Sequence, residues 1–318
     1  MTLAKNTPLD KNAKIYIAGH KGLVGSAILK FYLAKGFTNI ITKTHSECDL
    51  VDTAQVENLF KTYKPDYVFC AAAKVGGIHA NNTYKASFIY ENIMIQTNII
   101  HQSYLHNVKK LLFLGSSCIY PKFSAQPIKE ESLLTGALEQ TNDAYAVAKI
   151  AGIKMCQSYN DQYGTNFISV MPTNMYGPND NYDLKNSHVL PALIRKFHEA
   201  KETNSPTVTL WGTGKALREF LYADDCAHAC HFLMENYQAS DIINVGTGTD
   251  QSILDLAMKI KSIVGYEGNI EFDSSMPDGT PKKQLDVTKL FNLGWNPTTS
   301  LEDGIKLAYK DFLSTYPR

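Results

Sequence analysis

Residues 15–36 read IYIAGHKGLVGSAILKFYLAKG. The short apolar run at the start predicts a buried strand, and the segment after the glycines predicts a helix. Gly19, Gly22 and Gly25 lie at this junction, where backbone amides and the positive end of the helix can hold a diphosphate. Their G-x-x-G-x-x-G spacing differs from the G-x-G-x-x-G of many dehydrogenases, so the strand–helix context carries the prediction of a dinucleotide-binding loop. A purely structural turn is the alternative.

The alternation of strand and helix continues through the first half of the chain. Predicted strands lie at 14–18, 39–43, 67–72, 110–116 and 167–172, and predicted helices lie near 23–35, 53–63, 82–107 and 143–163. The strands are continuous apolar runs, which is typical of a parallel sheet covered by helices on both faces. We therefore predict an α/β fold with a doubly wound, Rossmann-type parallel sheet.

The pattern changes after Pro172. Long loops, a helix from about His188 and short strands near 207–212 and 270–273 predict a second, smaller α/β lobe, whereas a helix and strand at about 223–246 return to the main sheet. The predicted division is a Rossmann domain of residues 1–173 plus about 219–249, and a lobe of about 174–218 plus 250–318. Ligands are expected in the crevice between the two parts, at the carboxyl ends of the strands.

The composition excludes several classes of protein. The 318 residues carry 31 basic and 31 acidic side chains, a net charge of +0, so no long-range attraction to nucleic acid or to an anionic membrane is expected. The polar opening MTLAKNTPLDKNAK lacks the features of a signal peptide, and no later run reaches the roughly 20 apolar residues of a spanning helix, which predicts a cytoplasmic protein. Six cysteines without a CxxC pair predict neither a metal site nor disulfides.

The end of the second predicted strand indicates which dinucleotide binds. An NAD enzyme usually places an acidic residue there for the ribose 2′-hydroxyl, whereas this chain has Lys43 and His45, with Lys21 in the glycine loop. Cations suit a 2′-phosphate, so NADP(H) is favoured over NAD(H); solvated surface side chains are the alternative. Asp49 and Leu50 follow where an adenine-edge contact could form. The predicted cofactor contacts of this part are Gly19, Lys21, Gly22, Leu23, Val24, Gly25, Lys43, His45, Asp49, Leu50 and Ala72.

A tyrosine and a lysine lie one helical turn apart in YAVAK, residues 145–149. A phenol with a pKa of about 10 is a weak acid–base group at neutral pH, but a cation such as Lys149 close by would lower the pKa of Tyr145. Ser116 ends the strand one crossover upstream, at the same edge of the sheet. YxxxK alone also occurs in ordinary surface helices, so the order of the three features matters more than any one of them.

Glycine loop, strand-end serine and YxxxK together resemble the extended short-chain dehydrogenase/reductase family, many of whose members act on nucleotide sugars. Longer segments make nearly the whole chain similar to the GDP-L-fucose synthase family within it. These segments are AAAKVGGIHANNTY (71–84), GSSCIYPK (115–122), YAVAKIAGIKMCQSYN (145–160), VMPTNMYGPNDNY (170–182), SHVLPALIRKFHEA (187–200) and PDGTPKK (277–283). The resemblance implies conversion of GDP-4-keto-6-deoxy-D-mannose to GDP-L-fucose, by epimerisation at C3 and C5 followed by reduction of C4 with NADPH.

The same resemblance implies roles for individual residues. Ser116, Tyr145 and Lys149 would form the reductase triad, with Tyr145 giving a proton to O4. Cys118 and His188 would be the acid–base pair of epimerisation, since a thiol and an imidazole both titrate near neutrality. Further NADP contacts would be Lys149, Pro172, Thr173, Asn174, Met175 and His188. The lobe would bind the GDP-sugar through Lys196, Trp211 and Arg218, with Asp278 and Lys283 as weaker candidates.

Two positions depart from the family pattern. Lys196 stands where an arginine is expected, so fork-like binding of a diphosphate becomes binding by a point charge. His45 stands where an arginine would read the 2′-phosphate, which weakens the preference for NADPH and makes it dependent on pH.

The family also implies a homodimer through paired helices near 82–107 and 143–163. Three alternatives for the function stay open. The same chemistry could act on another GDP-4-keto sugar, a 6-deoxy-heptose or a dideoxy sugar, because one methylene changes binding by only about 1–3 kcal/mol. The enzyme could reduce without epimerising. The chain could also be a non-catalytic module that senses NADP or a nucleotide sugar.

Overall fold

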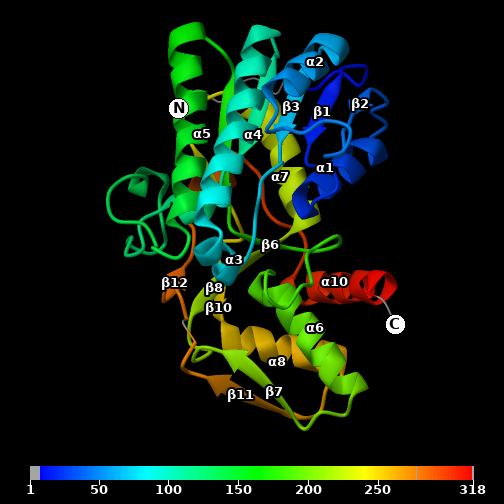
Figure 1. Ribbon diagram of the computed structural model, residues 1–318, viewed down its shortest axis with the longest axis vertical. Coiled ribbons are helices and arrows are strands. Elements are labelled where there is room, and N and C mark those ends of the chain that lie inside the picture. The colour runs from blue at the N-terminus through cyan, green and yellow to red at the C-terminus, as the bar shows by residue number, and fades with distance from the viewer. Residues whose placement is uncertain (1–7, 277, 317–318) are drawn as a thin grey trace.

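The structure is a computed structural model that describes residues 8–276 and 278–316 (Figure 1). Residues 1–7, 277 and 317–318, which the predicted domain ranges and the PDGTPKK motif include, lie outside the described residues. Within the described part, six parallel strands form the main sheet in the order β2-β1-β3-β4-β5-β9, which confirms the predicted doubly wound fold. These strands are β1 (Ile15–Ala18), β2 (Ile40–Ile41), β3 (Tyr67–Cys70), β4 (Lys110–Leu114), β5 (Phe167–Pro172) and β9 (Ile243–Val245).

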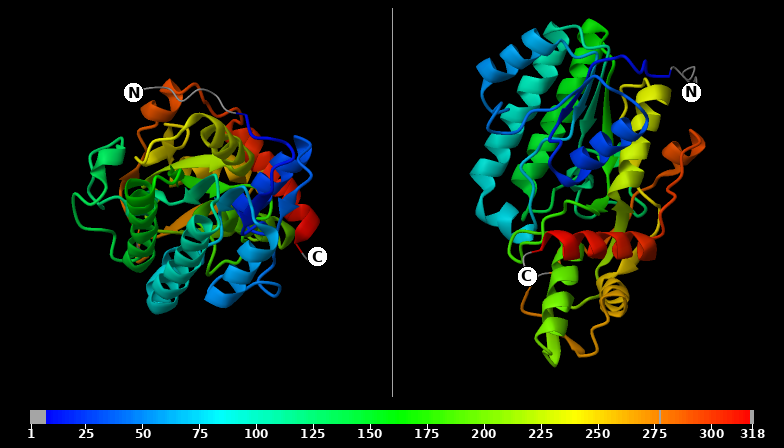
Figure 2. Two further views of the ribbon diagram at one scale, coloured as in Figure 1. Left: turned by 90° about the horizontal axis from the view of Figure 1, so that it is seen from above. Right: turned by 90° about the vertical axis from the view of Figure 1, so that its right-hand side faces the viewer.

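Each strand of this sheet sends alternate side chains into two separate cores. In β1, Ile15 and Ile17 join one cluster of buried side chains, whereas Tyr16 and Ala18 join the other. Two layers of helices cover the two faces (Figure 2, right). The first layer is α1 (Leu23–Ala34) and α7 (Ala223–Asn236), and the second is α2 (Thr53–Tyr63), α4 (Lys85–Leu105) and α5 (Asp143–Tyr163). Because both faces are buried, the strands read as continuous apolar runs.

Local signals set the ends of α2 and α5. The Asp52 carboxylate caps α2 by accepting hydrogen bonds from the backbone N–H groups of Ala54 and Gln55, at 2.9 and 3.2 Å. Gly164 ends α5 with a φ of 67°, a conformation that glycine adopts without a steric penalty. Both helices therefore begin and end where the sequence predicts.

The predicted single helix at 82–107 is two helices. Tyr84, with φ −109° and ψ 36°, separates α3 (Ile78–Thr83) from α4. The buried Asn92 of α4 then holds the chain that leaves β3: its Oδ1 accepts from the backbone N–H of Lys74 and its Nδ2 donates to the carbonyl of Lys74, both at 3.0 Å. These two hydrogen bonds fix the segment between β3 and α3. The spacing of apolar residues in the sequence gives no sign of such a contact.

A smaller α/β lobe lies below the main sheet (Figure 1). Its central strand β8 pairs with β10, β12 and β6, and a separate parallel pair joins β7 to β11. The strands are β6 (Asn174–Tyr176), β7 (Thr207–Trp211), β8 (Leu217–Tyr222), β10 (Asp250–Ser252), β11 (Asn269–Asp273) and β12 (Lys282–Lys283). The helices of the lobe are α6 (Val189–Glu202), α8 (Ile253–Val264) and α10 (Leu301–Thr315), whereas α9 (Thr288–Asn292) contacts β9 and its Leu290 joins the core of the main sheet. The sequence predicts α6, β7 and β11, and it misses the other elements of this lobe.

Strand β9 joins the main sheet beside β5, as predicted for the segment that returns there. The predicted boundary near residue 219 falls inside β8, whose partners all belong to the lobe. The division into an NADP-binding domain and a nucleotide-sugar-binding lobe stays a prediction. Along the described chain, none of the helices combines the length and apolar character that crossing a membrane requires.

Candidate active site

The glycine loop forms a cradle that side chains would fill. Gly19 has a φ of 84°, and a Cβ on it would lie 2.7 Å from the backbone nitrogen of Ala72. A Cβ on Gly25 would overlap the carbonyl oxygen of Gly19, so helix α1 packs against the turn only because both residues are glycine. Gly22 is exposed and directly precedes α1, whose first turn contains no acidic residue. This open helix end fits the diphosphate of a dinucleotide.

The other predicted residues of the glycine loop divide by burial. Lys21 is exposed beside Gly22. Leu23 and Val24 are half-buried and pack against the core under α1, which leaves their backbone rather than their side chains for a ligand. Ala72 meets Gly19, as the need for small residues there predicts.

The bases predicted to read a 2′-phosphate each face an acid. Lys43 Nζ lies 3.8 Å from the Glu47 carboxylate, and the imidazole of His45 lies 3.6 Å from that of Asp49. Contact with the Tyr63 hydroxyl, followed by the charge of Glu47, raises the pKa of Lys43, so its ammonium stays charged. Lys43 and His45 therefore both stand after β2, and the acids beside them offset part of any positive charge there.

The residues that follow β5 are fixed by hydrogen bonds to strands β9 and β8. Thr173 donates its backbone N–H to the carbonyl of Val245 and its hydroxyl to that of Glu219, at 3.0 and 3.3 Å. Asn174 Nδ2 donates to the same Glu219 carbonyl at 2.8 Å, and Met175 is half-buried in β6. Pro172 is the last residue of β5. These contacts place the whole segment at the carboxyl edge of the main sheet.

Ser116 stands in a tight turn at the end of β4. Its hydroxyl oxygen caps the short helix Ser117–Ile119 by accepting from the backbone N–H of Cys118 at 3.2 Å. The chain beyond is anchored by Tyr120, whose hydroxyl donates to Asn244 Oδ1 at 2.6 Å in the buried interior. The turn thus presents the hydroxyl of Ser116 and the thiol of Cys118 from a rigid support.

The Tyr145–Lys149 pair of α5 differs from expectation in its electrostatics. Lys149 is buried, its Nζ donates to the carbonyl of Leu114 at 2.8 Å, and burial lowers its pKa to about 8. The pKa of Tyr145 is raised, first by burial and then by the charge of Cys118, and contact with the Ser116 hydroxyl only partly opposes this. The prediction that Lys149 lowers the pKa of Tyr145 is therefore wrong: desolvation of the phenol dominates, and the charge of Lys149 is not among the causes that act on it. A protonated phenol at neutral pH can act as a proton donor.

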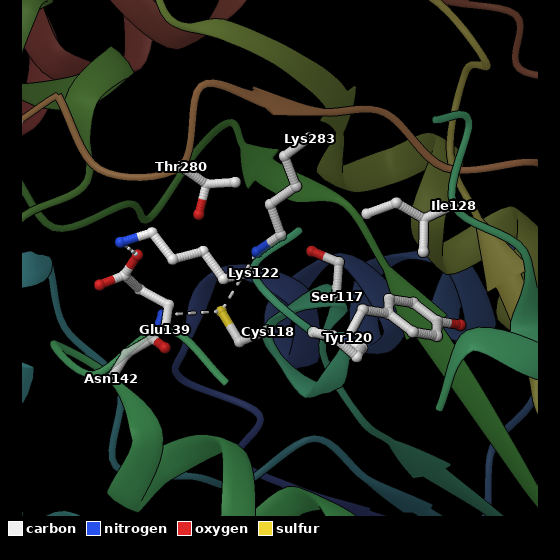
Figure 3. A pocket seen from close by; sticks show the side chains of 10 residues that line it. Ser117, Cys118, Tyr120, Lys122, Ile128, Glu139, Asn142, Thr280 and Lys283 are labelled. Atoms are coloured by element: carbon white, nitrogen blue, oxygen red, sulfur yellow. Dashed lines mark hydrogen bonds and ion pairs between the residues drawn. The ribbon is translucent and has the colours of Figure 1, made fainter. Parts of the chain in front are cut away.

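Cys118 receives two hydrogen bonds that meet at its sulfur (Figure 3). Lys283 Nζ donates to Sγ at 3.3 Å and Asn142 Nδ2 donates at 3.4 Å. Burial acts to raise the pKa of the thiol, but the charge of Lys283, together with Ser116 and Arg218, outweighs it, and the net pKa is lowered. The thiolate is the form that this surrounding favours.

His188 precedes α6 and is reached by solvent. The loop before it is held close to α3: the backbone N–H of Gly77 donates to the carbonyl of Asn186 at 2.8 Å, and a Cβ on Gly77 would overlap the carbonyl oxygen of Ser187. Desolvation by the surrounding protein is the first cause that lowers the pKa of His188, and the charge of Lys283 is the second. The ammonium of Lys283 therefore acts on both members of the predicted acid–base pair.

The predicted substrate residues form two groups in the lobe. Lys196 Nζ donates to the carbonyl of Thr209 at 3.0 Å and lies 5.7 Å from the ring centroid of Trp211, which is 47% exposed at the end of β7. Lys283 pairs with Arg218 across the neighbouring strands β12 and β8. The first group lies near the tip of the lobe, and the second adjoins the pocket at Cys118.

Arg218 and Asp278 contact each other through the backbone and not as an ion pair. Arg218 Nη2 donates to the carbonyl of Asp278 at 3.1 Å. The Asp278 carboxylate instead accepts from the backbone N–H and the hydroxyl of Thr213, both at 2.7 Å. Asp278 thus holds the loop after β7, and the guanidinium of Arg218 keeps further donors for a ligand. In the described part of the chain, no cluster of three His, Cys, Asp or Glu side chains could hold a metal ion.

The comparisons with known proteins show the family of the chain. The model of the NAD dependent epimerase/dehydratase family matches residues 15–246. GDP-L-fucose synthase 1 of Arabidopsis thaliana is 58% identical over 96% of this chain and 94% of its own length. This chain belongs to the GDP-L-fucose synthase family. It is also similar to the NADP-bound structure of a GDP-L-fucose synthetase from Naegleria fowleri, at 32% identity and a TM-score of 0.92 over 99% of this chain and 97% of that one.

Another similar structure belongs to a GDP-6-OMe-4-keto-L-xylo-heptose reductase from C. jejuni. It is 41% identical with a TM-score of 0.92, over 97% of this chain and 99% of that one. The predicted resemblance to the GDP-L-fucose synthase family is thus confirmed, and the chain belongs to a family of enzymes.

Two residues of this GDP-L-fucose synthase family member escaped the sequence reasoning. Asn142 contacts the Cys118 sulfur from 24 positions away in the sequence. Its polar side chain directly before the YxxxK helix was the single signal that could have indicated it. Glu219 is fully buried and accepts from the backbone N–H groups of Gly248 and Leu285, at 2.8 and 2.9 Å. Burial is the chief cause that raises its pKa. This carboxyl ties β8 to the loop after β9 and to the chain that follows Lys283.

Proposed function

We propose that this enzyme is an NADPH-dependent 3,5-epimerase and 4-reductase that converts GDP-4-keto-6-deoxy-D-mannose to GDP-L-fucose. One observation carries the proposal. Ser116 accepts a hydrogen bond from the backbone N–H of Cys118, and both the Ser116 hydroxyl and the charge of the Cys118 thiol act on the pKa of the Tyr145 phenol, which supports one shared pocket for the reductase and epimerase groups. Membership of the GDP-L-fucose synthase family supports the substrate.

Epimerisation uses the acidity that the C4 ketone gives to the protons on C3 and C5. In our proposal, Cys118 and His188 act as the acid–base pair: one takes the carbon-bound proton, leaving an enolate, and the other returns a proton to the opposite face of that carbon. The number of protons on the sugar is unchanged after each inversion. The hydroxyls of Ser116 and Tyr145 donate hydrogen bonds to the enolate oxygen and stabilise its charge.

Reduction uses the same pocket with a different proton donor. The glycine cradle, Lys43 and His45 after β2 and the segment after β5 would hold NADPH, which when bound supplies a hydride to C4. Tyr145 keeps its proton at neutral pH because its pKa is raised, and it gives that proton to O4 as the alcohol forms. The ammonium of Lys149 donates to the Leu114 carbonyl, and its other donors would be available to the cofactor ribose.

The GDP-sugar would lie across the crevice between the sheet edge and the lobe. Arg218 suits a phosphate or a sugar oxygen, because its guanidinium donates to two carbonyls and has five N–H groups. Lys196 beside Trp211, with Asp278 and Lys283, completes the proposed set of substrate contacts.

The test is product identification after turnover. The protein is incubated with GDP-4-keto-6-deoxy-D-mannose and NADPH, absorbance follows the oxidation of NADPH, and NMR identifies the sugar. GDP-L-fucose is the expected product. An uninverted product would leave a reductase alone, and a failure to oxidise NADPH with any GDP-4-keto sugar would favour the sensing module.

Another GDP-4-keto sugar is the second candidate substrate, and the likeness to the C. jejuni heptose reductase favours it. The two are separated by kcat/KM for the 6-deoxy-hexose and for a 6-deoxy-heptose under identical conditions. The proposed function requires the hexose to be the better substrate.

We propose that the enzyme works as a homodimer in the cytoplasm. Tyr90 of α4 and Tyr163 of α5 are 59% and 46% exposed, which suits helices that pack against a second copy. Six cysteines without a disulfide in the structure suit a reducing compartment. Light scattering after gel filtration tests the dimer, which a mass near 35.4 kDa would contradict.

A further inference from the structure

Cys118 is the most accessible thiol of the chain. The other five cysteines are buried, namely Cys48, Cys70, Cys156, Cys226 and Cys230. Cys118 is partly exposed and lines the pocket at the lobe. A reagent that attacks thiolates should therefore report on Cys118 in the folded protein.

The sulfur of Cys118 is held from two sides of the crevice (Figure 3). Lys283 reaches it from β12 of the lobe at 3.3 Å, and Asn142 reaches it from the start of α5 at 3.4 Å. A thiol is a weak acceptor, whereas a thiolate accepts strongly and carries the charge that an ammonium stabilises. Two donors aimed at one sulfur are thus the surrounding of a thiolate.

The charges around the thiol reinforce this arrangement. The titratable and charged groups that face it, or share its pocket, are Lys283 of β12, Arg218 of β8, Tyr145 of α5, and Lys122 and Glu139 of the segment between β4 and α5. Glu139 would oppose a thiolate, but Lys122 Nζ lies 2.8 Å from its carboxylate and offsets that charge. The remaining balance around the sulfur is positive, and the pKa of Cys118 is lowered accordingly.

The register of β12 directs Lys283 to the sulfur. Lys282 and Lys283 are neighbours in one strand, so their side chains point to opposite faces. Lys282 Nζ lies 3.3 Å from the Asp250 carboxylate, away from the thiol, whereas Lys283 contacts Cys118. The chain therefore supplies its own control: an adjacent lysine in the same strand without contact to the sulfur.

We propose that Lys283 and Asn142 are positioning residues that hold Cys118 as a thiolate, Lys283 through its charge and Asn142 through its amide donor. We call these two donors and the Cys118 sulfur the thiolate cradle, and its role in catalysis rests on the proposed epimerase function. The cradle itself is a property of the free enzyme. For Lys283 this role replaces the substrate contact proposed above, because its ammonium contacts the Cys118 sulfur and acts on the reaction through it.

The experiment measures the rate of Cys118 alkylation by iodoacetamide against pH, in the full chain without substrate, by mass spectrometry of the Cys118 peptide. Lys283→Met is expected to move the midpoint to higher pH and to slow alkylation at pH 7 about tenfold or more, since one pKa unit is tenfold in thiolate. Asn142→Leu is expected to slow it about threefold. Lys283→Arg should restore most of the rate, and Lys282→Met should match the wild type. Circular dichroism confirms that each variant is folded.

Equal alkylation profiles for wild type, Lys283→Met and Lys282→Met would overturn the proposal, and so would a slow profile shared by both lysine variants. Turnover then separates an effect of Lys283 on the Cys118 thiolate from an effect on substrate binding. In deuterated solvent, Lys283→Met should lose deuterium incorporation at C3 and C5 more than NADPH oxidation. A raised KM with an unchanged alkylation profile would make Lys283 a substrate contact instead. If wild type turns over no substrate, the proposed function fails. The alkylation profile still shows whether Lys283 and Asn142 hold Cys118 as a thiolate.

Discussion

The two ends of strand β4 each hold a buried lysine, and the two side chains use their donors differently. Lys110 begins the strand, and its Nζ donates to the carbonyls of Leu233, Met234 and Tyr237 at 3.0, 2.7 and 2.5 Å. Lys149 lies at the other end and, among the described residues, donates a single hydrogen bond, to the carbonyl of Leu114. An ammonium has three donors, so the first is saturated and the second is not.

Burial lowers the pKa of both lysines to about 8, so that shift alone does not distinguish a structural from a functional group. The difference lies in the unused donors and in their place. Lys110 closes the end of α7 at the amino edge of the sheet, whereas Lys149 keeps two donors at the carboxyl edge, where the glycine loop and Ser116 converge.

The largest expected effect is at the carboxyl edge. Lys149→Met should lower kcat for NADPH oxidation by about 10³-fold, since it removes the buried cation beside the proposed proton donor. The free energy of unfolding should change by about 1 kcal/mol or less, because the lysine makes one hydrogen bond to the protein. Stopped-flow absorbance and chemical denaturation measure the two effects. If Lys149→Met loses stability but oxidises NADPH at the wild-type rate, Lys149 is a structural lysine like Lys110.

The next effect is on stability against pH. Lys110 has a pKa of about 8 in the folded protein against 10.5 when unfolded, so between these values the unfolded chain binds more protons. Its contribution therefore makes the protein more stable as pH rises from about 8 to 10.5, by about 3 kcal/mol, and this gain is lost as pH falls back through 8. Urea denaturation across this range should show a larger rise in wild type than in Lys110→Met, which keeps the contribution of Lys149. Parallel curves for the two proteins would refute the assignment.

Lys110→Met should then lower the free energy of unfolding at pH 7 by about 2 kcal/mol, because three buried carbonyls lose their donor. The rate of NADPH oxidation should stay at the wild-type value, since the amino edge of the sheet lies away from the pocket. Denaturation and steady-state kinetics measure both. A slower enzyme with intact stability would show that the saturated lysine serves the reaction.

The smallest expected effect is at Lys289, which separates the number of unused donors from the position of a buried lysine. Lys289 of α9 donates to the carbonyl of Ile242 at 3.0 Å, just before β9, and thus resembles Lys149 in its bonding but Lys110 in its position. Lys289→Met should cost less than about 1 kcal/mol and leave kcat unchanged. If kcat falls, unused donors rather than position mark a functional lysine.

The sequence predicts the main sheet well because its physical signal is local. Both faces of β1 and its neighbours are buried, so each strand is a continuous apolar run between recognisable turns. The lobe is different, since β6, β10 and β12 are two or three residues long and gain their identity from pairing with β8. Such short segments carry no period of their own. The break at Tyr84 likewise depends on tertiary contacts and not on helix propensity.

The site shows the same limit. Gly19, Gly25 and Ser116 could be predicted because a turn and a strand end impose them locally. The roles of Cys118 and His188 came from family resemblance and stay predictions. The rise in the pKa of Tyr145 could not be foreseen, because desolvation depends on chain that folds over the phenol from elsewhere. Contact between Cys118 and Lys283 spans 165 positions and leaves no pattern in the sequence.

The absence of a side chain at Gly77 has a practical consequence for engineering. Its bare backbone seats the segment that leads to His188, since any larger residue there would displace the carbonyl of Ser187. Because Ser187 directly precedes His188, the residue at position 77 influences where the imidazole lies without belonging to the acid–base pair. A substitution at Gly77 would therefore change the room for a bulkier sugar by moving His188, while the groups on β4 and α5 keep their places.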